Sequence, residues 1–186
     1  MSDILEMKAV FDALPEHLVK ALQRYQTAKP EADLGGEFYT YALNAALRAH
    51  ASQRALQQDV LDLDAAIAEY TLKAPVTLYR GETDGERFSG LQLGKTFSQA
   101  CFVSTSTRWN NLHTHLKRSQ PGPVVVFTLR VLNGVSAAYL GSNESEVLLG
   151  RNRSYKAISV SDGDPQNYVS GGTKVTSLRE VILEVS

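Results

Sequence analysis

The sequence predicts an α+β fold, because helix-like periodicity in roughly its first 73 residues gives way to strand-like patterns after Pro75. Helices gathered at one end of a chain and strands at the other favour this class over a doubly wound sheet, in which the two alternate. A length of 186 residues fits one domain with a sizeable core. No linker divides the chain, so we expect a single domain over 1–186, with a helical layer at 1–73 packed on a β-rich core at 74–186.

Helices are predicted in the N-terminal part from apolar residues that recur at intervals of three and four. The first carries Ile4, Met7, Val10, Phe11 and Leu14, and Pro15 ends it. A second short helix carries Leu18, Leu22 and Tyr25, and a third spans "EFYTYALNAALRAH" at 37–50. The last has a seam of Leu56, Val60, Leu63, Ile67 and Tyr70. This seam predicts that one face of the helix packs against the rest of the domain.

Strands are predicted in the C-terminal part by segments rich in β-branched and aromatic residues. They are "VTLYR" (76–80), "FVSTST" (102–107), "VVVFTLRVL" (124–132), "EVLLG" (146–150), "YKAISVS" (155–161) and "VTSLREVILEV" (175–185). Turn signals such as "SDGDP" and "SGGT" separate them. In the strand at 124–132 one alternate set of residues is wholly apolar, whereas the other includes Thr128 and Arg130. We therefore expect that strand to face the core on one side.

The charge balance and the cysteine content exclude several classes of function. Lys and Arg number 19 against 20 for Asp and Glu, and a net charge of −1 argues against general nucleic-acid binding. The single cysteine, Cys101, rules out an internal disulfide and a thiolate metal cluster, and we interpret it as a small buried hydrophobe. The N-terminus lacks the apolar core of a signal peptide, and no apolar run approaches the ~20 residues of a membrane span.

Common nucleotide-binding and hydrolase motifs are absent from the chain. No two glycines are spaced as G-x-G, and neither a Walker A loop nor a G-x-S-x-G elbow occurs. His113 and His115 flank Thr114 in an expected helix, where residues two apart do not face each other. With no further ligand motif beside them, we expect no zinc site there.

Three polar elements remain, each at or near a predicted strand. Arg80 closes the apolar strand of "LYRG", either as an exposed charge or as a planar fork for a phosphate or ribose. The hydroxyl run at 104–106 is either an ordinary polar strand or a means of orienting a catalytic carboxylate. Glu144 and Glu146 stand two apart at the mouth of a strand, so both are expected on one face, as solvated charges or as an active site.

In this order, the three elements resemble those of the bacterial mono-ADP-ribosyltransferase toxins and effectors of the Arg, Ser-Thr-Ser, Glu-x-Glu class. The chain reads "LYRG", then "FVSTS", then the apolar strand "PVVVFTLRV", then "NESEVLLG". More loosely, "YTYALNAALR" resembles the family's Tyr-x-x-hydrophobic-Asn-x-x-Leu-Arg helix, and "LQLGKTFSQACFVSTS" resembles its Gly-Lys turn before the serine strand. The resemblance covers about residues 37–186, and the ordered combination is much more specific than any single motif.

The resemblance implies a cleft between two roughly perpendicular, antiparallel-rich sheets that binds NAD as co-substrate, without a metal. In such domains nicotinamide leaves the ribose with its bonding electrons, so positive charge develops on the sugar. Glu146 matches the carboxylate that hydrogen-bonds the ribose 2′-hydroxyl and stabilises this charge. Ser104 matches the serine that holds that carboxylate, and Arg80 matches the arginine that anchors NAD. Glu144 matches the glutamate that engages an acceptor arginine.

Further NAD contacts are assigned through the resemblance alone. Gly81 stands after Arg80 where some relatives have a second arginine, and Thr105 and Ser106 complete the serine strand. Asn44 and Arg48 either reach NAD from the helix at 37–50 or serve only in helix packing and as an exposed charge.

The remaining assignments concern residues outside the three main elements. Arg118 lies where relatives carry a second arginine that contacts phosphate. His115 falls near the position of an aromatic that stacks on nicotinamide, a role that Trp109 could also fill. Tyr139 lies in the loop that usually meets the target protein, although packing within the sheet suits it equally.

The resulting functional prediction is an arginine-specific mono-ADP-ribosyltransferase that acts as a bacterial effector or toxin on a target protein. An NAD glycohydrolase and a catalytically inactive binding module on the same fold remain as alternatives. We expect synthesis in the bacterial cytoplasm without a signal peptide and delivery into a target cell by a secretion system. Its partners would then include an immunity protein or secretion chaperone, with no membrane association.

Overall fold

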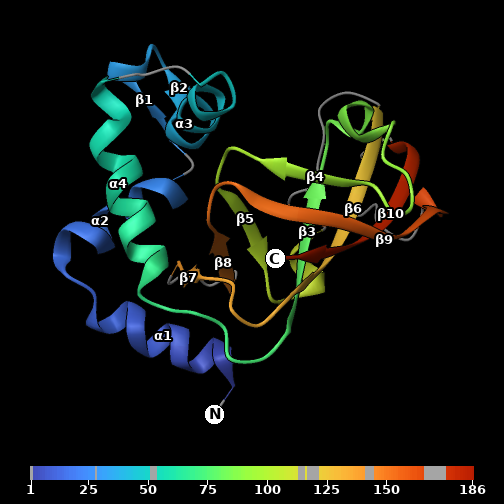
Figure 1. Cartoon of the computed structure of the whole chain (residues 1–186). Helices are drawn as coiled ribbons and strands as arrows, with labels where there is room; N and C mark the ends of the chain where they lie inside the picture. Colours follow the sequence, from blue (N-terminus) through green and yellow to red (C-terminus); the bar gives the residue numbers. More distant parts are fainter. Residues whose placement is uncertain are drawn as a thin grey trace.

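A computed structural model of the chain describes residues 2–27, 29–50, 54–112, 116, 122–140, 145–165 and 175–186. The α-helices gather on one side of the molecule and the larger sheet lies on the other, as Figure 1 shows. This arrangement confirms the predicted α+β class and the N-terminal position of the helical layer.

The helical layer contains four α-helices among the described residues. They are α1 (Asp3–Ala13), α2 (Glu16–Gln26), α3 (Tyr39–Arg48) and α4 (Arg54–Ala68). A two-stranded antiparallel ribbon, β1 (Pro30–Glu31) with β2 (Glu37–Phe38), links α2 to α3. The boundary between α1 and α2 follows from Pro15, which has no backbone N–H to donate and disfavours helical geometry in the residue before it. No helix in the described part of the chain is long and apolar enough to cross a membrane.

In the part of the chain that the structure describes, the larger sheet has eight strands in the order β4-β9-β10-β6-β3-β5-β8-β7. Their bounds are β3 (Val76–Glu82), β4 (Thr96–Gln99), β5 (Val103–Ser106), β6 (Gly122–Val131), β7 (Ala137–Tyr139), β8 (Glu146–Leu149), β9 (Arg153–Gly163) and β10 (Val175–Val185). Among these described strands, only β10 and β6 run parallel, and every other neighbouring pair is antiparallel.

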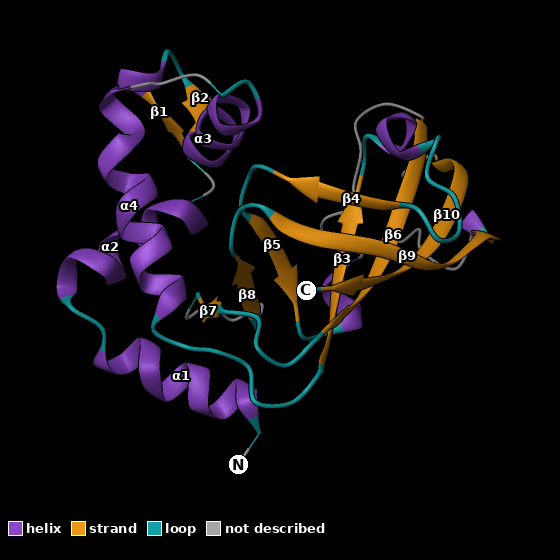
Figure 2. Ribbon diagram, viewed as in Figure 1, coloured by secondary structure: helices purple, strands orange, loops and turns teal. Residues whose placement is uncertain are grey.

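Hydrogen bonds between strands join the two expected sheets into one continuous sheet. Strands β3 and β5 pair at one position, Tyr79 opposite Ser106, so this contact is the narrow junction between the two halves. In Figure 2, β5, β8 and β7 lie on the side nearest the helices, and β3, β6 and β10 lie beyond them. The site elements Arg80 and Ser104 come from the two strands that meet at the junction.

Strand β6 departs from the prediction, because its N-terminal half is buried on both faces. Val125, Phe127 and Leu129 pack in the main sheet core, as expected. On the opposite face, Val124 and Val126 are also buried, in a smaller cluster with Leu112, Leu116 and Leu178. Only the C-terminal half of the strand shows the predicted one-sided pattern, with Arg130 exposed. The alternation of residues in β6 could not predict that other residues cover the second face of the strand.

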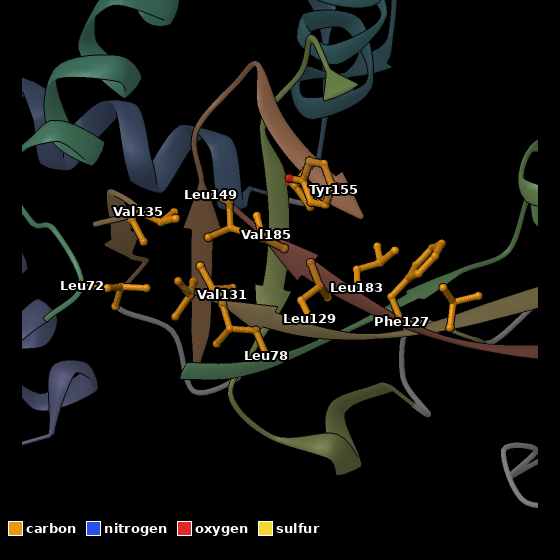
Figure 3. Close-up of a cluster of buried hydrophobic side chains, with 14 of the residues drawn as sticks. Leu72, Leu78, Phe127, Leu129, Val131, Val135, Leu149, Tyr155, Leu183 and Val185 are labelled. Carbon is orange, nitrogen blue, oxygen red and sulfur yellow. The ribbon is translucent and has the colours of Figure 1, made fainter. Parts of the chain in front are cut away.

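Two apolar clusters hold the helical layer and the sheet together. The sheet core, drawn in Figure 3, includes Leu78, Phe127, Leu129, Val131, Leu149, Tyr155, Leu183 and Val185, and it also contains Met7 of α1. The helix–sheet core joins Leu22, Leu43 and Leu63 from the helices to Phe102, Ala138 and Leu148 from the sheet side. Leu63 is fully buried, and burial of such a side chain contributes about 1.5–3 kcal/mol. The helices therefore form a layer against the β5–β8–β7 end of the sheet.

Candidate functional site

A cleft of about 610 Å³ opens where the helical layer meets the junction of the sheet. Its walls come from the C-terminal end of α2, from α3, from β3, from β5 with the residues just before it, and from Glu146 at the start of β8. Arg80, Ser104 and Glu146 all line this cleft. The three separated motifs therefore converge on one cavity, because pairing of β3 with β5 and of β5 with β8 brings them together.

Glu146, the first residue of β8, follows a residue whose backbone conformation is left-handed. Ser145 has a φ of 52°, and its carbonyl accepts a hydrogen bond of 3.0 Å from the Thr107 backbone N–H. The Glu146 carbonyl accepts a bond of 3.1 Å from the Leu140 N–H. Strand β8 therefore begins at Glu146, directly after this left-handed residue. The expectation that both glutamates lie on one face stays a prediction, because Glu144 lies outside the described residues.

Each carboxylate oxygen of Glu146 accepts a hydrogen bond. Ser104 Oγ donates to Oε1, and Gln26 Nε2 donates to Oε2 at 2.9 Å. In the register of β5 with β8, Ser104 lies opposite Leu148, two residues beyond Glu146 on the same face. Such diagonal neighbours are within reach across antiparallel strands. The structure therefore places the hydroxyl of the serine strand on the carboxylate, together with an amide from the helical layer.

Arg80 is fixed by two partners on opposite sides of its guanidinium. Its Nε donates to Glu82 Oε1 at 2.6 Å, and its Nη1 donates to the Ser104 carbonyl at 2.5 Å. Burial alone would lower the pKa of Arg80, but the neighbouring Glu82 carboxylate outweighs it, so the pKa is raised and the charge is kept. Because a guanidinium has five N–H donors, the two bonds leave it further donors for a phosphate in the cleft.

Thr105 and Ser106 border the cleft, but their hydroxyls bond within the protein. Thr105 Oγ1 donates to the Val147 carbonyl at 2.7 Å and so reinforces the pairing of β5 with β8. Ser106 Oγ accepts from the Arg108 backbone N–H at 3.0 Å and from Asn111 Nδ2 at 2.9 Å. These bonds hold the strand and the turn after it, and in the serine strand only Ser104 bonds the carboxylate.

Helix α3 contributes Asn44 and Arg48 to the cleft. Asn44 Nδ2 donates to the Tyr25 hydroxyl at 2.9 Å, while its buried Oδ1 has no hydrogen-bond partner among the residues that the structure describes. A buried acceptor without a partner is costly, so this atom suits a ligand that brings an N–H or O–H donor. Arg48 Nη1 lies 3.7 Å from the sulfur of Cys101. Cys101 is only 3% exposed, as expected for a small buried residue.

Of the remaining residues predicted to contact NAD, one lines the cleft and the others do not or lie outside the described residues. Gly81 lines the cleft, and a Cβ at this position would lie 2.8 Å from Leu116 Cδ2, so the absence of a side chain permits close packing. Trp109 packs edge-on against Tyr79 with ring centroids 5.3 Å apart, and Tyr79 is the one of the two that lines the cleft. Arg118 and His115 lie outside the described residues.

Tyr139 packs within the fold and lies away from the cleft lining. It belongs to β7, opposite Val147, and its ring makes an edge-to-face contact with Phe11 of α1 at 6.3 Å. Of the two interpretations of Tyr139, packing in the sheet is therefore the one that the structure supports.

Gln26 and Glu82 were missed as site residues by the sequence reasoning. Gln26 lies 120 positions from Glu146, and nothing in "RYQTAK" distinguishes it from a solvated glutamine. Glu82 is two residues from Arg80 on the same strand, so the pairing rule for alternate residues could have identified it. Among the described residues, no group of three or more His, Cys, Asp or Glu side chains could hold a metal ion.

Comparisons with known proteins agree with this geometry. A family model described as ADP-ribosyltransferase exoenzyme matches residues 20–183. Solved structures with the same fold include Plx2a, an ADP-ribosyltransferase toxin from Paenibacillus larvae. It has 18% identity and a TM-score of 0.70, with 100% of this chain and 97% of that chain covered. An ADP-ribosyltransferase from Clostridium botulinum has 16% identity and a TM-score of 0.69, with coverage of 98% and 94%.

A third similar structure contains a dinucleotide. The ADP-ribosylating toxin BECa of a binary enterotoxin of C. perfringens, solved with NADH, has 18% identity and a TM-score of 0.68. The match covers 100% of this chain and 49% of that chain. No curated protein sequence matches the chain significantly. At these sequence identities the similarity to solved structures establishes the fold alone. The assignment of the chain to a family rests on the match of the family model.

Proposed function

The chain belongs to the ADP-ribosyltransferase exoenzyme family, whose members use NAD as substrate, and we propose that it transfers ADP-ribose from NAD to an arginine of a target protein. One observation supports NAD cleavage in this cleft: Arg80, Ser104 and Glu146 line it together, and Ser104 holds the carboxylate of Glu146. We further propose that the helical layer and the β-rich part act together as one catalytic domain, since the cleft has walls from both.

The cleft offers groups that complement the parts of NAD. The raised pKa of Arg80 keeps a cation beside β5, which suits the diphosphate. Glu146 offers a carboxylate, held by Ser104, to the 2′-hydroxyl of the ribose next to nicotinamide. The buried Oδ1 of Asn44 can accept from a hydroxyl or amide of the ligand. These complementary groups support NAD as the co-substrate.

Cleavage places positive charge on the ribose. The bond between C1′ and the nicotinamide nitrogen breaks, and its electron pair leaves with nicotinamide, so the sugar becomes an oxocarbenium-like centre. A carboxylate at the 2′-hydroxyl stabilises that charge where it develops, and it needs little reorganisation if it is already held in place. This is the role that we assign to Glu146.

Transfer to arginine requires a second group for the acceptor. A guanidinium nitrogen forms the new bond to C1′, and the proton that it loses must go to a base. We assign this role to Glu144, because a carboxylate pairs with guanidinium through two hydrogen bonds and accepts a proton. The two glutamates thus divide cleavage and transfer between them. A bacterial toxin or effector delivered by a secretion system, with an immunity protein or chaperone as partner, is the biological setting that we propose.

Labelling with biotinylated NAD tests this function directly. The purified protein is incubated with biotin-NAD and a cell lysate, and the labelled residue is identified by mass spectrometry. We expect a discrete set of labelled proteins modified on arginine. Glu144→Gln should keep NAD hydrolysis and lose arginine labelling. Labelling on another residue type would overturn the arginine assignment, and equal loss of both activities in Glu144→Gln would overturn the division of roles.

A further inference from the structure

We propose that Gln26, the last residue of α2, is a positioning residue that fixes the carboxylate of Glu146 for catalysis. This inference rests on the proposed function, because it assigns a role within the same site. It concerns a residue from the helical layer, which no motif of the serine strand or of the glutamate loop includes.

The bond from Gln26 completes the hydrogen bonding of the carboxylate. Gln26 Nε2 donates to Glu146 Oε2 at 2.9 Å, while Ser104 Oγ donates to Oε1. The last torsion of a glutamate side chain is broad, so rotamer preference alone does not set the plane of its carboxylate. A single donor leaves rotation about that torsion free, whereas one donor on each oxygen fixes the plane. Gln26 supplies the second constraint.

The end of α2 is rigid enough to hold such a donor in place. Tyr25, the preceding residue, is 3% exposed, accepts from Asn44 Nδ2 at 2.9 Å and donates to the Phe102 carbonyl at 3.4 Å. The rings of Tyr25 and Phe102 meet edge to face at 6.0 Å. Burial raises the pKa of Tyr25 to about 12, so its hydroxyl stays protonated as a donor at neutral pH.

A second anchor lies one residue further back on the helix. Arg24 donates from Nη2 to Glu31 Oε2 at 2.5 Å and from Nη1 to Asp59 Oδ2 at 2.8 Å. Its guanidinium also lies over the Tyr39 ring, 4.2 Å from the centroid. The last turn of α2 is therefore tied to the β1–β2 ribbon, to α3 and to α4, and Gln26 reaches Glu146 from a fixed base.

A neutral amide suits this role better than a cation would. It orients the carboxylate without cancelling the charge that the oxocarbenium-like centre requires. Each carboxylate oxygen can accept more than one hydrogen bond, so Gln26 and a ribose hydroxyl can be bound at the same time. Gln26 need not move when NAD binds, and its effect should appear in the chemical step.

Kinetics of NAD hydrolysis separate positioning from substrate binding and from packing. The variants are Gln26→Ala, which removes the donor, and Gln26→Glu, which keeps the length and adds a repelling carboxylate. Gln23→Ala is the matched control, because Gln23 is an exposed glutamine of the same helix. We expect kcat to fall about tenfold in Gln26→Ala, in line with loss of a hydrogen bond to a charged group, and further in Gln26→Glu. The KM for NAD should stay within about twofold, since binding is not the step affected.

Three results would overturn the inference. One is that Gln26→Ala leaves both kcat and KM unchanged. Another is a raised KM with kcat unchanged, which would make Gln26 an NAD contact. The third is higher activity in Gln26→Glu than in Gln26→Ala, since shape rather than the donor would then matter.

A second measurement does not depend on turnover. In 15N-labelled protein, Glu146→Ala should shift the side-chain amide resonances of Gln26 and leave those of Gln23 in place. Unshifted Gln26 resonances would contradict the inference. If the wild-type protein shows no NAD turnover but the resonances shift as expected, the proposed function fails while the contact between Gln26 and Glu146 stands.

Discussion

Ser104 Oγ donates a hydrogen bond to Glu146 Oε1 from a diagonal position on the neighbouring strand. The backbone carbonyl of the same serine accepts a bond of 2.5 Å from Arg80 Nη1. One residue of β5 thus connects the cation of β3 with the carboxylate of β8. The narrow junction between the two halves of the sheet is therefore also the centre of the site, and changes to any of the three residues should act on catalysis more than on folding.

Ser104→Ala should reduce the rate of NAD hydrolysis about tenfold, because Glu146 loses a charge-assisted hydrogen bond. The backbone bond to Arg80 remains, so we expect the KM for NAD to change little. Steady-state kinetics check this outcome. Ser98→Ala, at an exposed position on β4, is the control and should retain the wild-type rate. A wild-type rate in Ser104→Ala would show that the Ser104–Glu146 bond is dispensable.

Arg80→Lys should raise the KM for NAD by about tenfold, although it conserves the charge. A single ammonium cannot reproduce the two directions in which Arg80 donates, toward Glu82 and toward the Ser104 carbonyl, while also binding a phosphate. Thermal-shift titration with NAD measures the loss of binding, since a ligand stabilises the native state. Arg130→Lys, at an exposed position of β6, serves as control. Equal NAD affinity in the two variants would contradict the role of Arg80.

Gly81→Ala should destabilise the protein by about 1 kcal/mol through overpacking. A Cβ at Gly81 would lie 2.8 Å from Leu116 Cδ2 and 3.0 Å from its Cγ, and Leu116 can give way only in part because it is buried. Urea unfolding measures the difference. Gly90→Ala is the matched control, because a Cβ there meets nothing within 4 Å. A smaller effect at Gly81 than at Gly90 would show that the contact with Leu116 is not limiting.

Asp3→Asn should destabilise the protein at neutral pH, with an effect that vanishes in acid. The backbone N–H of Lys73 and the Tyr70 hydroxyl both donate to Asp3, at 2.9 and 2.6 Å, and lower its pKa. Because the folded-state pKa is depressed, the stabilisation is complete above about pH 4 and is lost as the pH falls through the folded-state value.

The measurement for Asp3 is the free energy of unfolding as a function of pH. The expected difference between wild type and Asp3→Asn is about 0.5–1 kcal/mol at pH 7, a modest value because the site is open to solvent. It should shrink as the pH falls through the folded-state pKa of Asp3. A difference that grows in acid would have the wrong sign for this account.

The helices and strands in which apolar residues recur at a regular spacing were predictable from the sequence. The seam of α4 is an example, since Leu56, Leu63 and Ile67 are buried as their spacing predicts. Strands β4 and β7 were not predicted. Strand β7 is the short "AAY", in which alanine has little strand preference, and β4 is the short, half-polar "TFSQ". Both take their strand conformation from the neighbours β8 and β9.

Residues of the candidate site were predictable only where they belong to a short sequence motif. Arg80, Ser104 and Glu146 stand in recognisable motifs, whereas Gln26 contacts Glu146 through tertiary packing over 120 positions. The expectation that Glu144 and Glu146 share one face stays a prediction, because Glu144 lies outside the described residues. The left-handed φ of Ser145, directly before β8, was not predictable from strand alternation.

The most direct test of the central claim is the rate of NAD hydrolysis by Glu146→Gln, measured beside its affinity for NAD. An amide is nearly isosteric with the carboxylate but carries no charge, so it cannot stabilise the positive ribose. We expect kcat to fall by about 10²–10³-fold, as for loss of a preorganised electrostatic group, with NAD still bound. A variant that hydrolyses NAD at the wild-type rate would contradict the role of Glu146 and, with it, the assignment of this cleft as the active site.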